Sequence, residues 1–136
     1  MWPAEVERIA APLRAAHIEA RLEELPPGED AFPGVGARAV AYECDGRTVV
    51  ALVPADGDVD SAKVAAVAGC RPYGPVAPPP FPFTAAARVF LEQRLLGSET
   101  VWLEAGSPRH VLGLEPSVLA YVTHAIPADL TQEGRI

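Results

Sequence analysis

Cysteine, long apolar runs and clustered positive charge are all scarce in this chain of 136 residues. The two cysteines, Cys44 and Cys70, form no CxxC pair and no Cys/His spacing, so neither a disulfide scaffold nor a zinc site is predicted, and two reduced thiols are expected. No stretch approaches the roughly 18 uninterrupted apolar residues that a bilayer-spanning helix needs. The acidic first residues do not resemble a secretory signal. We therefore expect a cytoplasmic protein with no membrane partner.

Positive charge is spread thinly along the chain. Eleven lysine and arginine residues stand singly against eighteen aspartate and glutamate residues, which gives a net charge of −7. Proteins that grip a long stretch of nucleic acid usually carry a basic face, because neutralising phosphates drives their affinity. The charge therefore argues against DNA as a partner and against extensive contact with RNA. Recognition of one terminus of a nucleic acid needs few phosphate contacts and is compatible with this composition.

Length and composition predict a single domain. Hydrophobic residues make up 49% of the chain and charged residues 21%, which is ordinary for a globular protein. A chain of this length can bury one core, and the segments on either side of its proline-rich stretch are too small to fold separately. We therefore expect one domain over residues 1–136, in which residues 131–136 form a frayed tail.

Hydrophobic periodicity predicts alternating helices and strands. Helices are expected at residues 5–16, 60–68 and 116–123, and strands at residues 17–25, 37–43, 48–53, 86–91, 99–105 and 110–114. Pro12 should kink or interrupt the first helix. Asp45-Gly46 signals a hairpin, and Asp60 and Gly69 are suited to cap the second helix.

The proline-rich stretch and the short connections refine this picture. Six prolines between Pro72 and Pro82 predict a rigid loop that is neither helix nor central strand. Hairpins and short connections favour antiparallel pairing, because parallel strands need long crossovers. The expected fold class is α/β (α+β), with one curved, mixed and mostly antiparallel sheet flanked by short helices.

The order of several motifs resembles the YbaK-like aminoacyl-tRNA editing domains, which are related to the insertion domain of prolyl-tRNA synthetase. The resemblance spans about residues 5–131. It is carried by the loop Gly74-Pro75-Val76-Ala77-Pro78, the strand and turn at 89–96, the Val-Trp-x-x-Ala-Gly-x-Pro segment at 101–108, the Leu-x-Pro-x-x-Leu helix start at 114–119, and Val59-Asp60 followed by Lys63. Each motif alone is weak, and their order and spacing carry the comparison.

The resemblance implies a trans-acting hydrolase that cleaves the ester between an amino acid and the 3′ end of a mischarged tRNA. The implied partners are the aminoacyl end of a tRNA and an aminoacyl-tRNA synthetase. Such a site needs a held water and a stabilised oxyanion, and neither a metal nor a cofactor is expected. The implied catalytic residues are Arg38, Gly74 and Gly106, and the implied substrate-binding residues are Val76, Pro78, Pro79, Ser107 and Pro108.

Three departures from the family pattern keep an alternative open. Arg38 stands where the family usually has a lysine, and Pro75 replaces a glycine and removes a backbone donor. Residues 26–36 lack the Ala-rich helix that normally closes one side of the pocket. The alternative is a non-catalytic relative that binds aminoacyl-adenosine-like ligands or a synthetase. A third reading is a small α/β protein with an unrelated small-molecule role.

Other candidate residues are less persuasive from sequence. The three histidines do not pair with a serine or cysteine in a nucleophile motif, so a triad is not supported. Ser107 shows no base near it in the sequence. Glu92 is expected to be a surface or turn-capping carboxylate rather than a general base.

Overall fold

The structure of the protein is a computed structural model that describes residues 2–28 and 31–132. The helices are α1 (Ala4–Ala15), α2 (Ser61–Ala68), α3 (Pro116–Thr123) and the short 3₁₀ helix η1 (Gln93–Gly97). The strands are β1 (Arg21–Glu24), β2 (Ala37–Cys44), β3 (Arg47–Pro54), β4 (Tyr73–Val76), β5 (Arg88–Glu92), β6 (Val101–Ser107), β7 (His110–Leu114) and β8 (Ile126–Ala128).

The strands form two sheets, where a single curved sheet was predicted. The smaller sheet has the order β1-β7-β6 and is antiparallel throughout. The larger has the order β4-β2-β3-β5-β8, with antiparallel pairing among β4, β2 and β3 and parallel pairing of β5 with β3 and β8. A bridge between Gly36 and Trp102 joins the two sheets. The predicted α+β single domain with mixed, mostly antiparallel pairing is confirmed.

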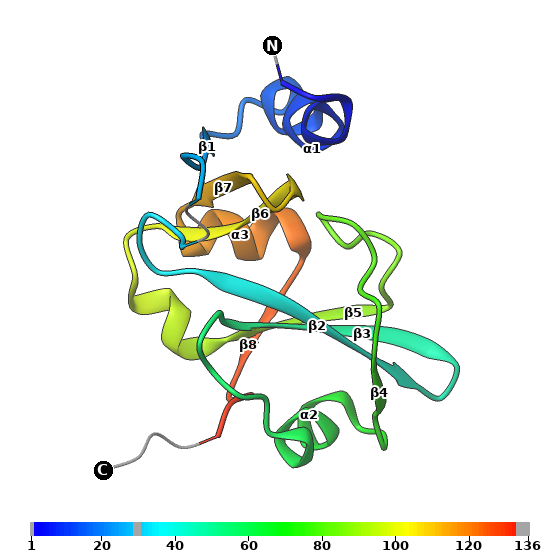
Figure 1. Cartoon of the computed structure of the whole chain (residues 1–136). Helices are drawn as coiled ribbons and strands as arrows, with labels where there is room; N and C mark the ends of the chain where they lie inside the picture. The colour runs from blue at the N-terminus through cyan, green and yellow to red at the C-terminus, as the bar shows by residue number, and fades with distance from the viewer. Residues whose placement is uncertain (1, 29–30, 133–136) are drawn as a thin grey trace.

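The layers of the molecule follow the alternation of side chains along its strands. In Figure 1, α1 and the smaller sheet lie at one end, α2 lies at the other, and the larger sheet crosses between them. One face of the larger sheet, with Ala41, Val50 and Leu91, joins the main core beside the smaller sheet and α3. The opposite face, with Val40 and Phe90, packs beneath α2. The central strands are therefore buried on both faces, as their continuous apolar runs require.

Helix α1 continues through Pro12 without a break. Val6, Ile9 and Leu13 are buried along one face of this helix. The expected interruption is therefore wrong, because burial of this apolar stripe compensates for the hydrogen bond that the proline cannot make.

Local turn and cap chemistry behaves as predicted. Asp45 and Gly46 both adopt positive φ, at 53° and 80°, in the tight turn that joins β2 to β3. The Asp60 carboxylate accepts hydrogen bonds from the backbone amides of Ala62 and Lys63, and Gly69 ends α2 in the left-handed conformation.

Two strands and one terminal segment were not anticipated. The proline-rich loop includes β4, which lies at the edge of its sheet, where proline is tolerated. Strand β8 has only three residues and pairs in parallel with β5. The expected fraying of residues 131–136 is wrong at its start, because Thr131 is buried and bridges to Val59. Residues 133–136 lie outside the described part of the chain.

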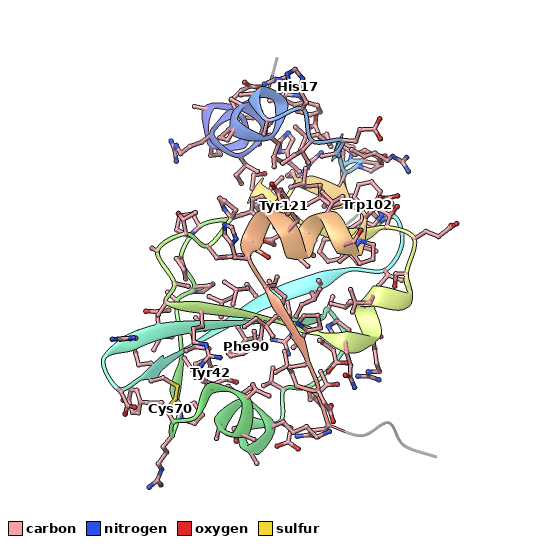
Figure 2. All side chains as sticks on the ribbon, turned by 180° about the vertical axis from the view of Figure 1, so that it is seen from behind. His17, Tyr42, Cys70, Phe90, Trp102 and Tyr121 are labelled. Atoms are coloured by element: carbon pink, nitrogen blue, oxygen red, sulfur yellow. A yellow bond between two sulfur atoms is a disulfide. The ribbon has the colours of Figure 1, made fainter. Side chains whose placement is uncertain are left out.

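Cys44 and Cys70 form a disulfide, so the prediction of two reduced thiols is wrong (Figure 2). Cys44 ends β2 and Cys70 follows the cap of α2, and the packing of α2 on the sheet brings their Cα atoms to 5.7 Å. That separation is typical of disulfides. Their separation of 26 residues in the sequence carries no signal of this contact. No helix in the described residues is long and apolar enough to cross a membrane.

Candidate functional site

A cavity of about 540 Å³ lies between β2, β6 and the loop that follows β4. It gathers six of the predicted site residues, namely Arg38, Pro78, Pro79, Gly106, Ser107 and Pro108. Ile9 of α1 and Phe32 also line it. Segments far apart in the sequence therefore meet here, and the cavity has the size of an ordinary small-molecule site.

The wall of the cavity is largely apolar and carries few polar groups. Its apolar residues are Ile9, Phe32, Ala37, Ala39, Ala55, Pro78, Pro79, Pro80, Phe81, Phe83, Leu103 and Pro108. The polar side chains are those of Arg38, Glu104 and Ser107. A mostly apolar cavity with a few fixed polar groups can orient a ligand that is charged at one or both ends.

Arg38 lies at the rim of the cavity and already has a partner. Its Nη2 atom donates a hydrogen bond of 2.8 Å to the carbonyl oxygen of Gly57, in the loop between β3 and α2. Along β2, Arg38 alternates with Ala37 and Ala39, so its side chain leaves the strand on the face shared with Tyr42. Burial raises the pKa of the Tyr42 hydroxyl, and the charge of Arg38 opposes that shift. The guanidinium must leave Gly57 before it can bind a ligand in the cavity.

Glu104 is a carboxylate that the sequence did not single out. It is an exposed residue of β6, between the buried Leu103 and Ala105, and it lines the cavity. Within residues 2–28 and 31–132, no side chain or backbone donor pairs with it. The only available signal was a charged residue inside an otherwise apolar strand. Its free carboxylate gives the cavity a site for a positively charged group.

A β-bulge distorts β6 next to the cavity. The ladder pairs Glu104 with Val111 and Ser107 with His110, so Ala105 and Gly106 have no residue opposite them. Gly106 has φ of +90°, and a Cβ atom there would lie 2.6 Å from the carbonyl oxygen of Glu5 in α1. The glycine is therefore needed for the close approach of α1 as well as for the bulge. A bulky residue at 106 is therefore expected to disturb the fold as well as the cavity.

Gly74 and Val76 do not line the cavity. Both belong to β4, which pairs with β2 at Ala41 and Glu43. Gly74 has φ of +144°, and a Cβ atom there would lie 2.9 Å from the backbone nitrogen of Val76. Its glycine is explained by backbone geometry at the sheet edge, and the structure does not bring it to the other predicted site residues.

Ser107 has a base beside it. Its Oγ atom lies 2.9 Å from Nδ1 of His110 and accepts a hydrogen bond of 3.0 Å from the backbone amide of Arg109. His110 is 7% exposed, and the Trp2 ring packs edge-on against it. This pair was not predicted from the sequence, although a Ser and a His that flank a two-residue turn occupy opposed positions in a hairpin.

Glu92 is a buried carboxylate that holds two distant segments of the chain together, and it does not act as a general base. Its carboxylate accepts hydrogen bonds from the backbone amides of Arg94 and Leu130, at 2.9 and 2.8 Å, and from Thr131. Burial alone would raise the pKa of this carboxyl, but these hydrogen bonds together lower it below its ordinary value. The expected turn-capping role is present at the start of η1, and the carboxylate is buried rather than at the surface.

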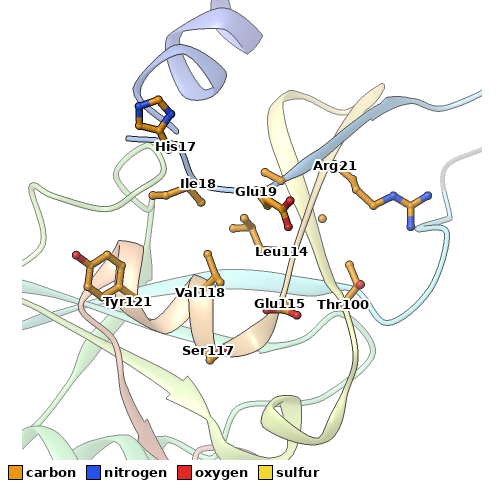
Figure 3. Close-up of a pocket in the computed structure, with 12 residues that line it drawn as sticks. His17, Ile18, Glu19, Arg21, Thr100, Leu114, Glu115, Ser117, Val118 and Tyr121 are labelled. Carbon is orange, nitrogen blue, oxygen red and sulfur yellow. The ribbon is translucent and has the colours of Figure 1, made fainter. Parts of the chain in front are cut away.

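A second cavity, of about 740 Å³, contains none of the predicted site residues (Figure 3). Figure 3 shows Val118 and Tyr121 of α3 on one side and Ile18 and Glu19, which precede β1, on the other. Glu115 and Arg21 add opposite charges at separate points of its lining. Among the described residues, no group of three or more His, Cys, Asp and Glu side chains is arranged to hold a metal ion.

The two sheets, three helices and cavity loops define a YbaK-like α+β fold. A proposed trans-editing enzyme for prolyl tRNA synthetase has a crystal structure that matches with a TM-score of 0.76 at 20% identity, over 98% of this chain and 100% of that one. A structure from work on grafting epitope backbones onto scaffold proteins by computational design matches with a TM-score of 0.82 at 22% identity, over 98% and 100%. The hypothetical protein APE2540 matches with a TM-score of 0.75 at 17% identity, over 94% and 99%.

These likenesses show a shared fold over nearly the whole chain. No protein-family model matches the sequence, and no curated protein matches it. Identities of 17–22% show that these proteins share a fold with this chain, but they do not show a shared activity. Evidence for an activity must come from the cavity.

Proposed function

We propose that this protein is a trans-acting aminoacyl-tRNA deacylase that removes a small amino acid from a mischarged tRNA. The observation that carries the proposal is the cavity itself, in which an apolar wall meets one free carboxylate and a bulged strand, with Arg38 at its edge. An aminoacyl-adenosine terminus offers the matching groups: an α-ammonium, an ester, an apolar base and a phosphate.

The free carboxylate of Glu104 suits the α-ammonium group of the amino acid. A charge-assisted hydrogen bond of this kind contributes about 1.5–3 kcal/mol. Arg38, at the rim, can exchange its bond with the Gly57 carbonyl for one with the terminal phosphate. The ester then lies between these charges, next to the bulge at Gly106.

The bulge supplies the chemistry that ester hydrolysis requires. Backbone amides that lack a ladder partner can donate to the oxyanion that forms when water attacks the carbonyl carbon. Ala105 and Gly106 have no residue opposite them in the ladder, and we assign this role to their amides. Removing one oxyanion donor typically lowers the rate by about 10²–10³. Gly74, which lies outside the cavity, is not assigned this role.

The overall charge of the protein fits recognition of a terminus alone. A net charge of −7 and few cations near the cavity limit the number of phosphates that the chain can neutralise. We therefore expect weak binding to the body of the tRNA and similar turnover of full tRNA and of short aminoacylated stem substrates.

The alternative, a non-catalytic relative that binds the same terminus or a synthetase, is favoured by one observation. Arg38 is already bonded to Gly57, so the cation is not presented to the cavity in this conformation. Binding of aminoacyl-adenosine analogues without any turnover would support this second function.

The test is a deacylation assay on a panel of mischarged tRNAs, with Glu104→Gln as the variant. We expect turnover by the wild type and an increase in KM of about tenfold in the variant, because a charge-assisted hydrogen bond is lost. Glu99→Gln, at an exposed position outside the cavity, is the matched control. N-acetylated substrates should be hydrolysed equally by wild type and Glu104→Gln. Absence of turnover on every tRNA of the panel would refute the proposed activity.

A further inference from the structure

The Ser107–His110 pair has the geometry of a proton relay at the edge of the cavity. Ser107 lines the cavity, whereas His110 lies behind it in β7. The Oγ and Nδ1 atoms are 2.9 Å apart. We propose that Ser107 passes a proton from the attacking water to His110, so that the two residues together act as the general base. This inference rests on the proposed deacylase function.

The hydroxyl oxygen of Ser107 has one lone pair that can accept a hydrogen bond from a water. A hydroxyl oxygen has one proton to donate and two lone pairs to accept with. One lone pair takes the amide proton of Arg109, at 3.0 Å. The relay that we propose requires the tautomer in which the hydroxyl donates its proton to Nδ1 of His110, 2.9 Å away. The second lone pair is free to accept a hydrogen bond from a water in the cavity.

The environment of His110 holds its ring in this orientation. The side chain is 7% exposed and the Trp2 ring packs against it at an interplanar angle of 87°, with centroids 5.7 Å apart. Within the described residues, every side-chain nitrogen or oxygen atom that is shut off from solvent has a hydrogen-bond partner. With Nδ1 as acceptor, the ring proton resides on Nε2, and a ring fixed in this tautomer is ready to accept a proton from Ser107.

The reaction balances as two proton transfers in each direction. The water gives a proton to Ser107 Oγ as the Ser107 proton moves to His110 Nδ1, and the water oxygen bonds to the ester carbonyl carbon. The carbonyl electron pair moves to its oxygen, beside the bulge amides. On collapse, the bond from the carbonyl carbon to the ribose 3′ oxygen breaks, and the proton on His110 returns through Ser107 to that oxygen. The products are the free amino acid and an intact tRNA terminus.

The simpler role for Ser107 is structural, since a serine at the start of a tight turn often bonds the amide two residues on. That role accounts for the bond with Arg109, but not for a buried imidazole on the same oxygen. If Ser107 were purely structural, kcat would not depend on His110.

The kinetic test compares Ser107→Ala, His110→Gln and the double variant. General acid–base catalysis typically contributes about 10²–10⁴ in rate, so we expect kcat to fall at least about 100-fold in each single variant, with little change in KM. The double variant should be no slower than either single one, because the residues act as a unit. Ser107→Thr keeps the hydroxyl and should restore most of the rate. Ser117→Ala, in the second cavity, is the control and should match wild type.

A second measurement does not depend on activity or on the folding of His110→Gln. Nitrogen-15 NMR of labelled histidine should show His110 Nδ1 without a proton in the neutral wild-type protein, and this state should be lost in Ser107→Ala. A proton found on Nδ1 overturns the relay. Full kcat in Ser107→Ala overturns it too, as does an acyl group found on Ser107 by intact mass after rapid quenching. A wild type inactive on every tRNA refutes the deacylase function itself, which separates that failure from failure of the relay alone.

Discussion

Replacing Glu92 by glutamine should destabilise the protein strongly, although the change removes no atoms from the core. The Glu92 carboxylate is fully buried and accepts hydrogen bonds on both of its oxygens. Glutamine can present one oxygen, to Leu130 and Thr131, and must then turn its NH₂ group towards the amide of Arg94. One charged hydrogen bond is lost, and the part-buried amide of Arg94 loses its acceptor. With about 1.5–3 kcal/mol for a hydrogen bond to a charged group, the free energy of unfolding should fall by about 3 kcal/mol.

The assay is urea unfolding at neutral pH, with Glu99→Gln as the exposed control. With a slope of about 2 kcal/mol/M, the midpoint of Glu92→Gln should fall by about 1.5 M, whereas that of the control should stay close to wild type. Equal midpoints for the two variants would refute this structural role of Glu92.

The acid dependence of stability provides an independent check of the same carboxylate. The hydrogen bonds of Glu92 hold its folded pKa below the ordinary value of 4.5. Its contribution to stability is therefore complete above that value and is lost as the pH falls from there through the lower folded pKa. We expect the stability difference between wild type and Glu92→Gln to shrink over that acid range. A constant difference from neutral pH down to strongly acidic pH would contradict this assignment.

Three further outcomes are expected. Gly106→Val should lower the melting temperature as well as the activity, because its Cβ would lie 2.6 Å from the Glu5 carbonyl oxygen and the residue has φ of +90°; an unchanged melting curve would contradict this. Reducing the Cys44–Cys70 disulfide, which closes a separation of 26 residues, should cost about 3.5 kcal/mol of stability, and free thiols in the air-oxidised protein would refute the bond. Arg38→Ala should raise the KM for aminoacyl-tRNA about tenfold through the lost charged contact, and an unchanged KM would leave Arg38 only its contact with the neighbouring loop.

The parts of the fold that depend on local chemistry could be predicted from sequence. The Asp45-Gly46 turn and the Asp60 and Gly69 caps follow from the conformations that these residues favour. Contacts between distant segments could not be predicted in this way. The Cys44–Cys70 bond depends on how α2 packs on the larger sheet, and nothing local to either cysteine reports that.

The candidate site shows the same division. The family resemblance predicted Arg38 and the Gly106–Pro108 turn, and the structure gathers these on one cavity. The resemblance could not report that Gly74 serves the sheet edge or that Arg38 is bonded to a loop, since both depend on side-chain direction and register. Glu104 was overlooked because a single charge in a strand is usually solvated.

The contact between Gly106 and the first turn of α1 makes the amino-terminal helix a structural part of the cavity. Ile9 lines the cavity from that helix, and the backbone of Glu5 lies directly against the bulge. Any fusion partner, label or binding protein that displaces α1 will therefore reshape the wall of this cavity without touching one of its polar residues. Engineered versions of this protein are therefore better extended from a part of the chain that does not contact α1.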